Sequence, residues 1–276
     1  MPDVATQDSG ILSLLTSRIS LPTSVQRLAE QYQTAKPYPH VVLDGMFDDQ
    51  ILDRLVSETP SLNNEKWVEN KDEHLTKYNL RSAVELADTG FQHVAFVHSA
   101  AFLYLLSEIT GIWELLPDPY LQGGGYHILP SGGKFDVHAD RNTAYETGLA
   151  RRLGMITYLN KDWKHEYGGQ LELWDKAGTR CEVVVEPVFN RTILFEIADT
   201  NFHGVPSPIA APGGRSRNSF VVYYHTAEGQ KKITPHSSVY APSFYQKKGR
   251  TFGQIVRDCT PPIIVRNFLK IFPPKH

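Results

Sequence analysis

The spacing of apolar residues changes near residue 120 and divides the chain into a helical first part and a strand-rich second part. In the first part, apolar side chains recur at helical spacing, with Ser24 and either Asp48 or Asp49 as caps. Helices are therefore predicted around 11–15, 25–32, 51–56 and about 99–115. After Pro37 and Pro39, the short apolar run 40–43 predicts one buried strand.

The second part consists of short apolar segments separated by Gly, Pro, Asn and Asp. Strands are predicted at 126–129, 152–159, 170–174, 181–185, 192–197 and 220–225. Such regular spacing indicates a β-sandwich or barrel. We expect an N-terminal helical segment (1–36), a β domain with a helical insert (37–226), and a C-terminal extension packed on the same domain (227–276).

Composition excludes several classes of protein. The 276 residues include 28 basic and 30 acidic side chains, a net charge of -2, so no broad basic surface exists for nucleic acid. Two cysteines exclude a disulfide scaffold and a zinc site made of thiolate pairs. No apolar run of roughly 18 residues predicts a membrane span, and no secretory signal is recognised. We expect a soluble, cytoplasmic protein; the oligomeric state is not predicted.

Candidate metal ligands lie in the strand-rich part. In the extended segment 135–140, His138 and Asp140 are two residues apart and therefore point to one face. His203 follows far downstream. Two histidines and one carboxylate form the facial triad that binds non-haem Fe(II) with open coordination positions. Taken singly, a His-x-Asp pair is more often a surface pair, and a lone histidine a core residue.

Arg217 begins the extended segment that continues into the predicted strand 220–225. From this position its guanidinium would project from the β core beside the metal. It would hold a carboxylate through two parallel hydrogen bonds. Arg215 is the competing candidate, but its position after Gly213 and Gly214 favours a solvated turn.

The ordered motifs resemble a known family. They are His138-x-Asp140, Gly168-Gly169-x-Leu171, His203-Gly204-Val205 and Arg217-x-Ser219. Together they resemble the 2-oxoglutarate and Fe(II)-dependent dioxygenases, specifically the prolyl hydroxylase-like branch. The segment 156–163 is similar to one in the hypoxia-inducible factor prolyl hydroxylases, and a bacterial group of such oxygenases is more similar still. The resemblance covers 37–226.

The resemblance implies a mainly β fold with flanking helices, a double-stranded β-helix (jelly roll) whose N-terminal helices pack on one sheet. It implies Fe(II) ligands at His138, Asp140 and His203, and a partner for the distal carboxylate of 2-oxoglutarate at Arg217. The residues implied around the cosubstrate are Tyr158, Ser219, Ile156, Leu171 and Val205. Tyr126 is a candidate to face the site, and Arg141, Arg151 and Arg152 are candidates to contact an anionic substrate, although solvated rim charges are the simpler interpretation.

The implied reaction consumes 2-oxoglutarate and O2, with ascorbate as a supporting reductant, and releases succinate and CO2 while one oxygen atom enters a substrate C–H bond. The related halogenases carry a small residue at the position of Asp140, so this carboxylate favours hydroxylation. A prolyl residue is the first candidate substrate; a small metabolite, a sugar or a carrier-bound amino acid are alternatives. A different class, a non-catalytic sensor that binds iron and 2-oxoglutarate, also accommodates the motifs. A cupin-like metal enzyme of different chemistry is a third interpretation, but it gives no function to Arg217.

Overall fold

The computed structural model describes residues 18–80 and 85–227. Contacts divide the chain into two units, 1–230 and 231–276, and all the described residues belong to the first. The helix expected at 11–15 and nearly all of the C-terminal extension lie outside the described residues.

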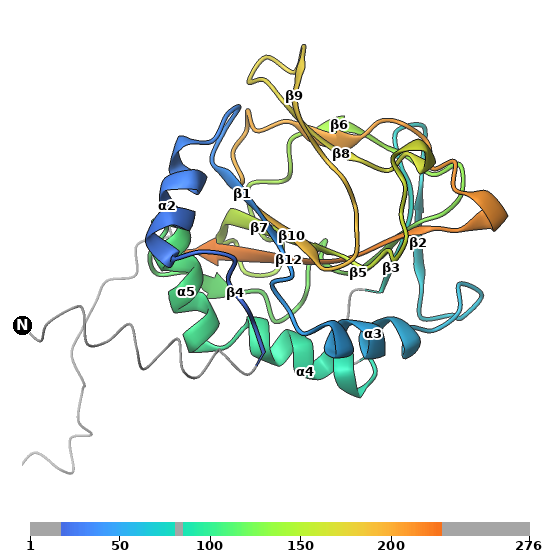
Figure 1. Cartoon of the computed structure of the whole chain (residues 1–276), viewed down its shortest axis with the longest axis horizontal. Helices are drawn as coiled ribbons and strands as arrows, with labels where there is room; N and C mark the ends of the chain where they lie inside the picture. The colour runs from blue at the N-terminus through green and yellow to red at the C-terminus, as the bar shows by residue number, and fades with distance from the viewer. Residues whose placement is uncertain (1–17, 81–84, 228–276) are drawn as a thin grey trace, which may run out of the picture. The chain divides into compact units, whose positions relative to one another are not determined.

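Two β-sheets form the centre of the described unit (Figure 1). The larger, eight-stranded sheet has the order β1-β10-β7-β12-β5-β3-β2, with β4 paired to β12. Its strands are β1 His40–Asp44, β2 Val68–Lys71, β3 Thr76–Leu80, β4 Leu116–Pro117, β5 Gly125–Leu129, β7 Ala150–Tyr158, β10 Arg191–Glu196 and β12 Arg217–Thr226. The smaller sheet has the order β6-β11-β8-β9, from β6 Phe135–His138, β11 His203–Val205, β8 Leu171–Trp174 and β9 Cys181–Val185. This arrangement confirms the mainly β fold with flanking helices.

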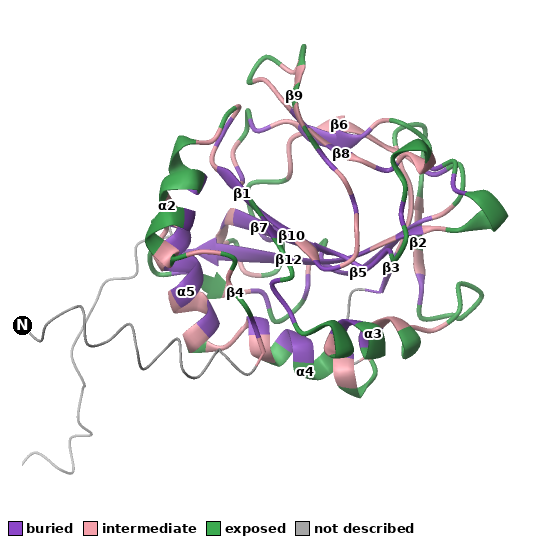
Figure 2. Cartoon of the chain, in the orientation of Figure 1, coloured by how far each residue is buried: buried purple, intermediate pink, exposed green. Residues whose placement is uncertain are grey.

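Four α-helices pack on the larger sheet, on the side away from β6, β8 and β9 (Figure 1). They are α2 Val25–Thr34, α3 Asp49–Ser57, α4 Asp88–Val97 and α5 Ala100–Thr110. The side chains of Ser24, Asp48 and Ser99 accept hydrogen bonds from the first turns of α2, α3 and α5, which confirms the two caps expected for the first two helices. The helices turn their buried faces inward (Figure 2); α2 and α3 expose polar residues on their outer faces, whereas α5 is largely covered.

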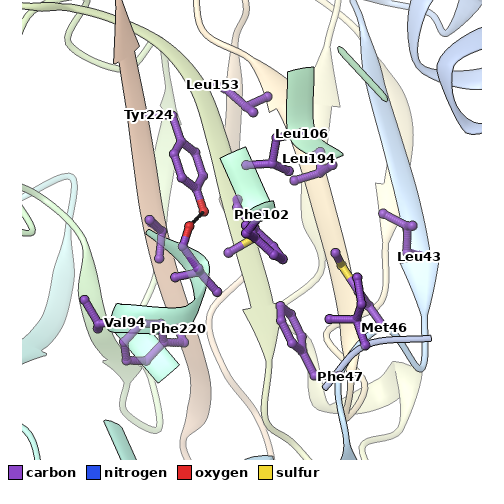
Figure 3. Packing of buried hydrophobic residues seen from close by; sticks show 14 of the residues in the cluster. Leu43, Met46, Phe47, Val94, Phe102, Leu106, Leu153, Leu194, Phe220 and Tyr224 are labelled. Carbon is purple, nitrogen blue, oxygen red and sulfur yellow. Dashed lines mark hydrogen bonds between the residues drawn. The ribbon is translucent and has the colours of Figure 1, made fainter. Parts of the chain in front are cut away.

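Alternation along β12 separates two hydrophobic clusters. Phe220, Val222 and Tyr224 point toward the helices, where Figure 3 shows Phe220 near Val94 of α4. The Tyr224 hydroxyl donates a hydrogen bond to the carbonyl of Val97, at 3.1 Å. The intervening residues of β12 face the smaller sheet instead and join the second cluster. The functional residues therefore lie on the inner face of a sheet whose outer face is anchored by helices.

The structure differs from the prediction in three places. The helix expected to reach residue 115 ends at Thr110, because Gly111 adopts a left-handed conformation with φ of 73°. Helix α4 was not predicted, because its buried His93 interrupts the apolar pattern. The hairpin of β2 and β3 was also missed, since both strands are rich in polar residues. The described residues also contain two short 3-10 helices, His165–Tyr167 and Pro212–Gly214.

No single helix within 18–80 and 85–227 has the length and apolar composition needed to cross a membrane. The helices α4 and α5 reach that composition only as a pair bent by 53°, and both contribute side chains to the core.

Candidate active site

Strand pairing brings the three candidate metal ligands together. His138, at the end of β6, lies directly opposite His203, at the start of β11. Asp140 follows β6; its Oδ1 lies 3.5 Å from Nε2 of His138, and its Oδ2 lies 3.5 Å from Nε2 of His203. The three ligand atoms lie within 4.8 Å of one another. The pairing of two strands distant in sequence thus brings His203 to the two residues, His138 and Asp140, that local spacing placed together.

Backbone carbonyl groups orient both imidazole rings. Nδ1 of His138 lies 2.8 Å from the carbonyl oxygen of Asp136, and Nδ1 of His203 lies 3.3 Å from that of Asn201. In the neutral tautomer that carries its proton on Nδ1, each ring would donate to the carbonyl and would keep the lone pair of Nε2, on the side of Asp140, for a metal ion. Because metal-bound histidines are held in this way, the rings are arranged before any ion arrives.

Glycine at position 204 permits this close approach of β11 to β6. A Cβ atom placed on Gly204 would lie 2.8 Å from Cα of Val137 and 2.9 Å from the carbonyl oxygen of Phe135. Both are backbone atoms, so no side-chain movement would relieve the contact. Any side chain here would force apart the strands that carry His138 and His203.

The donor set fits Fe(II). Nε2 of His138 is buried and has no hydrogen-bond partner in the described part of the chain, and an unsatisfied buried nitrogen is costly unless something binds it. Two imidazole nitrogens and one carboxylate suit non-haem Fe(II) and leave coordination positions for further ligands.

Charge within the cluster favours an ionised carboxylate. Burial raises the pKa of Asp140, but attraction to His203 and His138 outweighs it and holds this pKa well below its usual range. Burial lowers the pKa of His203, whereas the charge of Asp140 and the hydrogen bond to it raise that pKa above its ordinary value. An ionised carboxylate beside two imidazoles provides the negative charge that a divalent cation requires.

Arg217 enters the cavity between the sheets beside Tyr158. Its side chain is 4% exposed, and its Nε donates to the carbonyl of Gly169 at 2.7 Å. Its guanidinium carbon lies 4.9 Å from the centroid of the Tyr158 ring. The Tyr158 hydroxyl is buried without a hydrogen-bond partner among the described residues, and burial raises its pKa. A cation and an unsatisfied hydroxyl side by side match the needs of a carboxylate.

The cavity has an empty volume of about 480 Å³, part of it open to solvent. Every residue named from the sequence for the metal and cosubstrate lines it, except Tyr158, whose hydroxyl lies beside Arg217. Those lining residues are His138, Asp140, His203, Arg217, Ser219, Ile156, Leu171 and Val205. Sequence reasoning missed Lys77 and His127, which also line the cavity.

The candidate Tyr126 does not face this cavity. Its ring packs at 6.0 Å from that of Trp67 and at 6.4 Å from that of Phe220, in the cluster beneath the helices. Because successive side chains of a strand point to opposite faces, His127 takes the inner position. The interpretation of Tyr126 was therefore wrong by one residue. Arg141 does not line this cavity either; it lines a second, outer one.

Residues 124–225, which include all these ligands and the arginine, match the family model described as the 2OG-Fe(II) oxygenase superfamily. Over this region the chain is similar to that superfamily. The match begins just before β5 and ends within β12, so it includes the smaller sheet and strands β5, β7, β10 and β12 of the larger sheet, but not β1 to β4 or the N-terminal helices.

Solved structures share the fold of this chain. A prolyl-4-hydroxylase of Pseudomonas putida is 18% identical, with a TM-score of 0.52 over 74% of this chain and 99% of that one. A prolyl hydroxylase of Trichoplax adhaerens, in complex with a hypoxia inducible factor peptide fragment, is 15% identical, with a TM-score of 0.53 over 81% and 94%. A prolyl 4-hydroxylase of Phytophthora capsici is 22% identical, with a TM-score of 0.54 over 79% and 66%. At these identities the likeness establishes the double-stranded β-helix fold.

Tyr223 contacts a candidate metal ligand without itself belonging to the candidate ligands. Its hydroxyl donates to Oδ2 of Asp140 at 3.0 Å. We expect Tyr223→Phe to fold normally and to lower Fe(II) affinity by about 10- to 100-fold, as is usual when the partner of a metal ligand is lost. Anaerobic Fe(II) titration measures this, with Tyr167→Phe as control, because Tyr167 packs on Trp163 at a distance from the metal ligands. Unchanged affinity in Tyr223→Phe would contradict a role in orienting Asp140.

Proposed function

We propose that His138, Asp140 and His203 bind Fe(II) and that Arg217 and Tyr158 bind 2-oxoglutarate, in a hydroxylase that acts on a prolyl substrate. The observation that carries this proposal is the sharing of one cavity by an oriented His-Asp-His set and a buried arginine. Many classes of enzyme contain such a metal site. The buried arginine in the same cavity additionally provides a binding group for the distal carboxylate of a dicarboxylate.

When bound, Fe(II) with 2-oxoglutarate and O2 supplies the oxidation of a C–H bond to C–OH, with release of succinate and CO2. The protein contributes position and exclusion of water. Arg217 donates charge-assisted hydrogen bonds to the distal carboxylate, and the Tyr158 hydroxyl donates to the same group. This grip directs the 2-oxo acid end of the cosubstrate toward His138, Asp140 and His203.

Apolar side chains limit water in the cavity. Ile156, Leu171 and Val205 line it and are at most 9% exposed. They pack around the methylene groups expected between the two carboxylates of the cosubstrate, where no hydrogen bond is needed. A dry cavity also strengthens the attraction between Arg217 and a carboxylate.

A prolyl residue is proposed as the substrate because the structures of similar fold include prolyl hydroxylases from three different organisms. The test is incubation of the enzyme with Fe(II), 2-oxoglutarate, ascorbate and O2, together with free L-proline or proline-containing peptides. We expect succinate and a gain of one oxygen atom on proline, detected by mass spectrometry. Succinate without any modified prolyl product would overturn the substrate assignment and leave the reaction class standing.

A non-catalytic sensor is distinguished by the same measurement, because it would bind Fe(II) and 2-oxoglutarate but form no succinate in oxygen. A cytoplasmic location belongs to the proposal, and cell fractionation tests it.

A further inference from the structure

An irregularity in β7 directs a second arginine toward the active site. Pairing of β7 with β12 shifts between Tyr224 and His225, so that His225 lies opposite Arg151 and residue 152 is skipped. Such a bulge changes the face to which a side chain points. Arg151 consequently shares the inner face with Tyr223, and its guanidinium carbon lies 4.0 Å from the centroid of that ring.

Arg151 is a buried cation with unused hydrogen-bonding capacity. It is only 6% exposed, and its Nη2 donates to the carbonyl of Gln122 at 2.8 Å. Its Nε is buried and has no partner in the described part of the chain. No ion pair to a described carboxylate compensates its charge, and buried charges are rarely left in that state.

Lys77 is a second cation nearby, and it is half-buried. It lines the cavity that contains the metal ligands, and its Nζ lies 4.9 Å from the centroid of the Phe135 ring. Burial lowers its pKa; attraction to Asp140 opposes this, whereas the charges of Arg151 and Arg217 add to it. Within the described residues Lys77 also forms no ion pair. The charges of Lys77 and Arg151 thus oppose each other, although Lys77 lines the metal cavity and Arg151 lines a second cavity.

The loaded site does not neutralise these two cations. The double positive charge of Fe(II) balances the double negative charge of 2-oxoglutarate, and the positive charge of Arg217 balances the negative charge of Asp140. Both histidines are neutral when they bind a metal ion. Lys77 and Arg151 then remain without a counter-charge among the described residues. An anionic substrate would supply this negative counter-charge.

A larger cavity lies beside Arg151. It has an empty volume of about 1600 Å³, and Arg151 lines it, whereas Tyr223 lines the metal cavity. Its rim carries the exposed rings of Tyr120 and Tyr145, and the guanidinium carbon of Arg141 lies 3.6 Å from the centroid of the latter. A substrate lodged here would reach the metal cavity past Tyr223 and would meet Arg151 on the way.

We propose that the substrate presents a carboxylate to Arg151 and Lys77, so that the enzyme acts on a free or C-terminal residue rather than on an internal residue of a peptide. This inference rests on the proposed function, because it assumes that Arg217 is occupied by 2-oxoglutarate. A planar guanidinium with a free Nε–H suits a carboxylate, and the ammonium of Lys77 adds charge without directional demand.

The test compares two probes of nearly equal shape. N-acetyl-L-proline carries a carboxylate, and its N-methylamide replaces that group by a neutral peptide-like amide. Binding to the anaerobic enzyme, loaded with Fe(II) and saturating 2-oxoglutarate, is measured by calorimetry. We expect the carboxylate to bind at least about tenfold more tightly than the amide, as charge-assisted hydrogen bonds are stronger than neutral ones.

Variants assign the preference to named residues. Arg151→Gln and Lys77→Met are each expected to reduce the carboxylate preference to less than about threefold, and Arg151→Lys to retain part of it. Arg27→Gln, on the exposed face of α2, removes the same charge elsewhere and should leave the preference intact. Melting curves show that each variant is folded; should Arg151→Gln not fold, Lys77→Met and Arg151→Lys carry the test.

Equal binding of the two probes to the wild type, or an intact preference in both Arg151→Gln and Lys77→Met, overturns the proposal. Tighter binding of inorganic phosphate than of N-acetyl-L-proline overturns the assignment to a carboxylate. Binding of 2-oxoglutarate is measured in the same samples. Its absence in the wild type would contradict the proposed function itself, whereas intact 2-oxoglutarate binding with no carboxylate preference contradicts only this inference.

Discussion

Replacing His138 by alanine is expected to abolish succinate formation from 2-oxoglutarate and to lower Fe(II) affinity by more than about 100-fold. This exceeds the 10- to 100-fold loss typical for residues that only support a ligand, because the change removes one of three donors. The Nε2 atom of His138 is buried and unsatisfied, and its ring is already oriented by the carbonyl of Asp136, so no other described side chain replaces it.

The matched control is His165→Ala. His165 is exposed and pairs with Glu186 away from the cavity, so its loss should leave both Fe(II) affinity and succinate formation unchanged. Anaerobic titration with Fe(II), followed by addition of oxygen and measurement of succinate, provides both quantities. If His138→Ala retains wild-type turnover, the metal assignment fails.

Replacing Arg217 by methionine is expected to weaken 2-oxoglutarate binding by about 30-fold to several thousand-fold. Truncating one partner of a buried, hydrogen-bonded charge pair costs about 2–5 kcal/mol, and about 1.4 kcal/mol corresponds to a factor of ten. Fe(II) affinity should change little, because Arg217 is not among the donor atoms.

The ligand-free stability of Arg217→Met separates this role from a structural one. Methionine removes a buried cation whose desolvation is costly, which offsets the lost hydrogen bond to Gly169. We therefore expect Arg217→Met to have nearly the wild-type melting temperature in the absence of 2-oxoglutarate. Addition of 2-oxoglutarate should raise the melting temperature of this variant only slightly. The control is Arg215→Met, since Arg215 bonds to the carbonyl of Lys161 instead. A loss of 2-oxoglutarate affinity in Arg215→Met alone would reverse the assignment.

The parts of the fold predicted correctly depend on local signals. Ser24 and Asp48 begin helices because each side chain satisfies an amide of the first turn, and this is readable from a few adjacent residues. The metal ligands were found because His138 and Asp140 are neighbours in an extended segment, while the ordered family motifs connected them with His203 and Arg217.

The parts that were missed depend on strand register. Tyr126 and His127 are adjacent, and only the pairing of His127 with Ser219 shows which of them faces the cavity. The sequence likewise does not show whether Arg151 or its neighbour at position 152 points to the inner face of the sheet. The irregular pairing of β7 with β12 decides this. Lys77 lies in a polar segment without apolar alternation, and its burial results from residues distant in sequence.

The glycine between the two strands of the metal site has a consequence for the evolution of this enzyme. Position 204 tolerates no Cβ atom, because the nearest obstacles are backbone atoms of the facing strand. A selection for activity from a library randomised at this codon should therefore return glycine alone. By contrast, Gly213 has open space around it, and although its positive φ disfavours other residues, Asn or Asp should survive there.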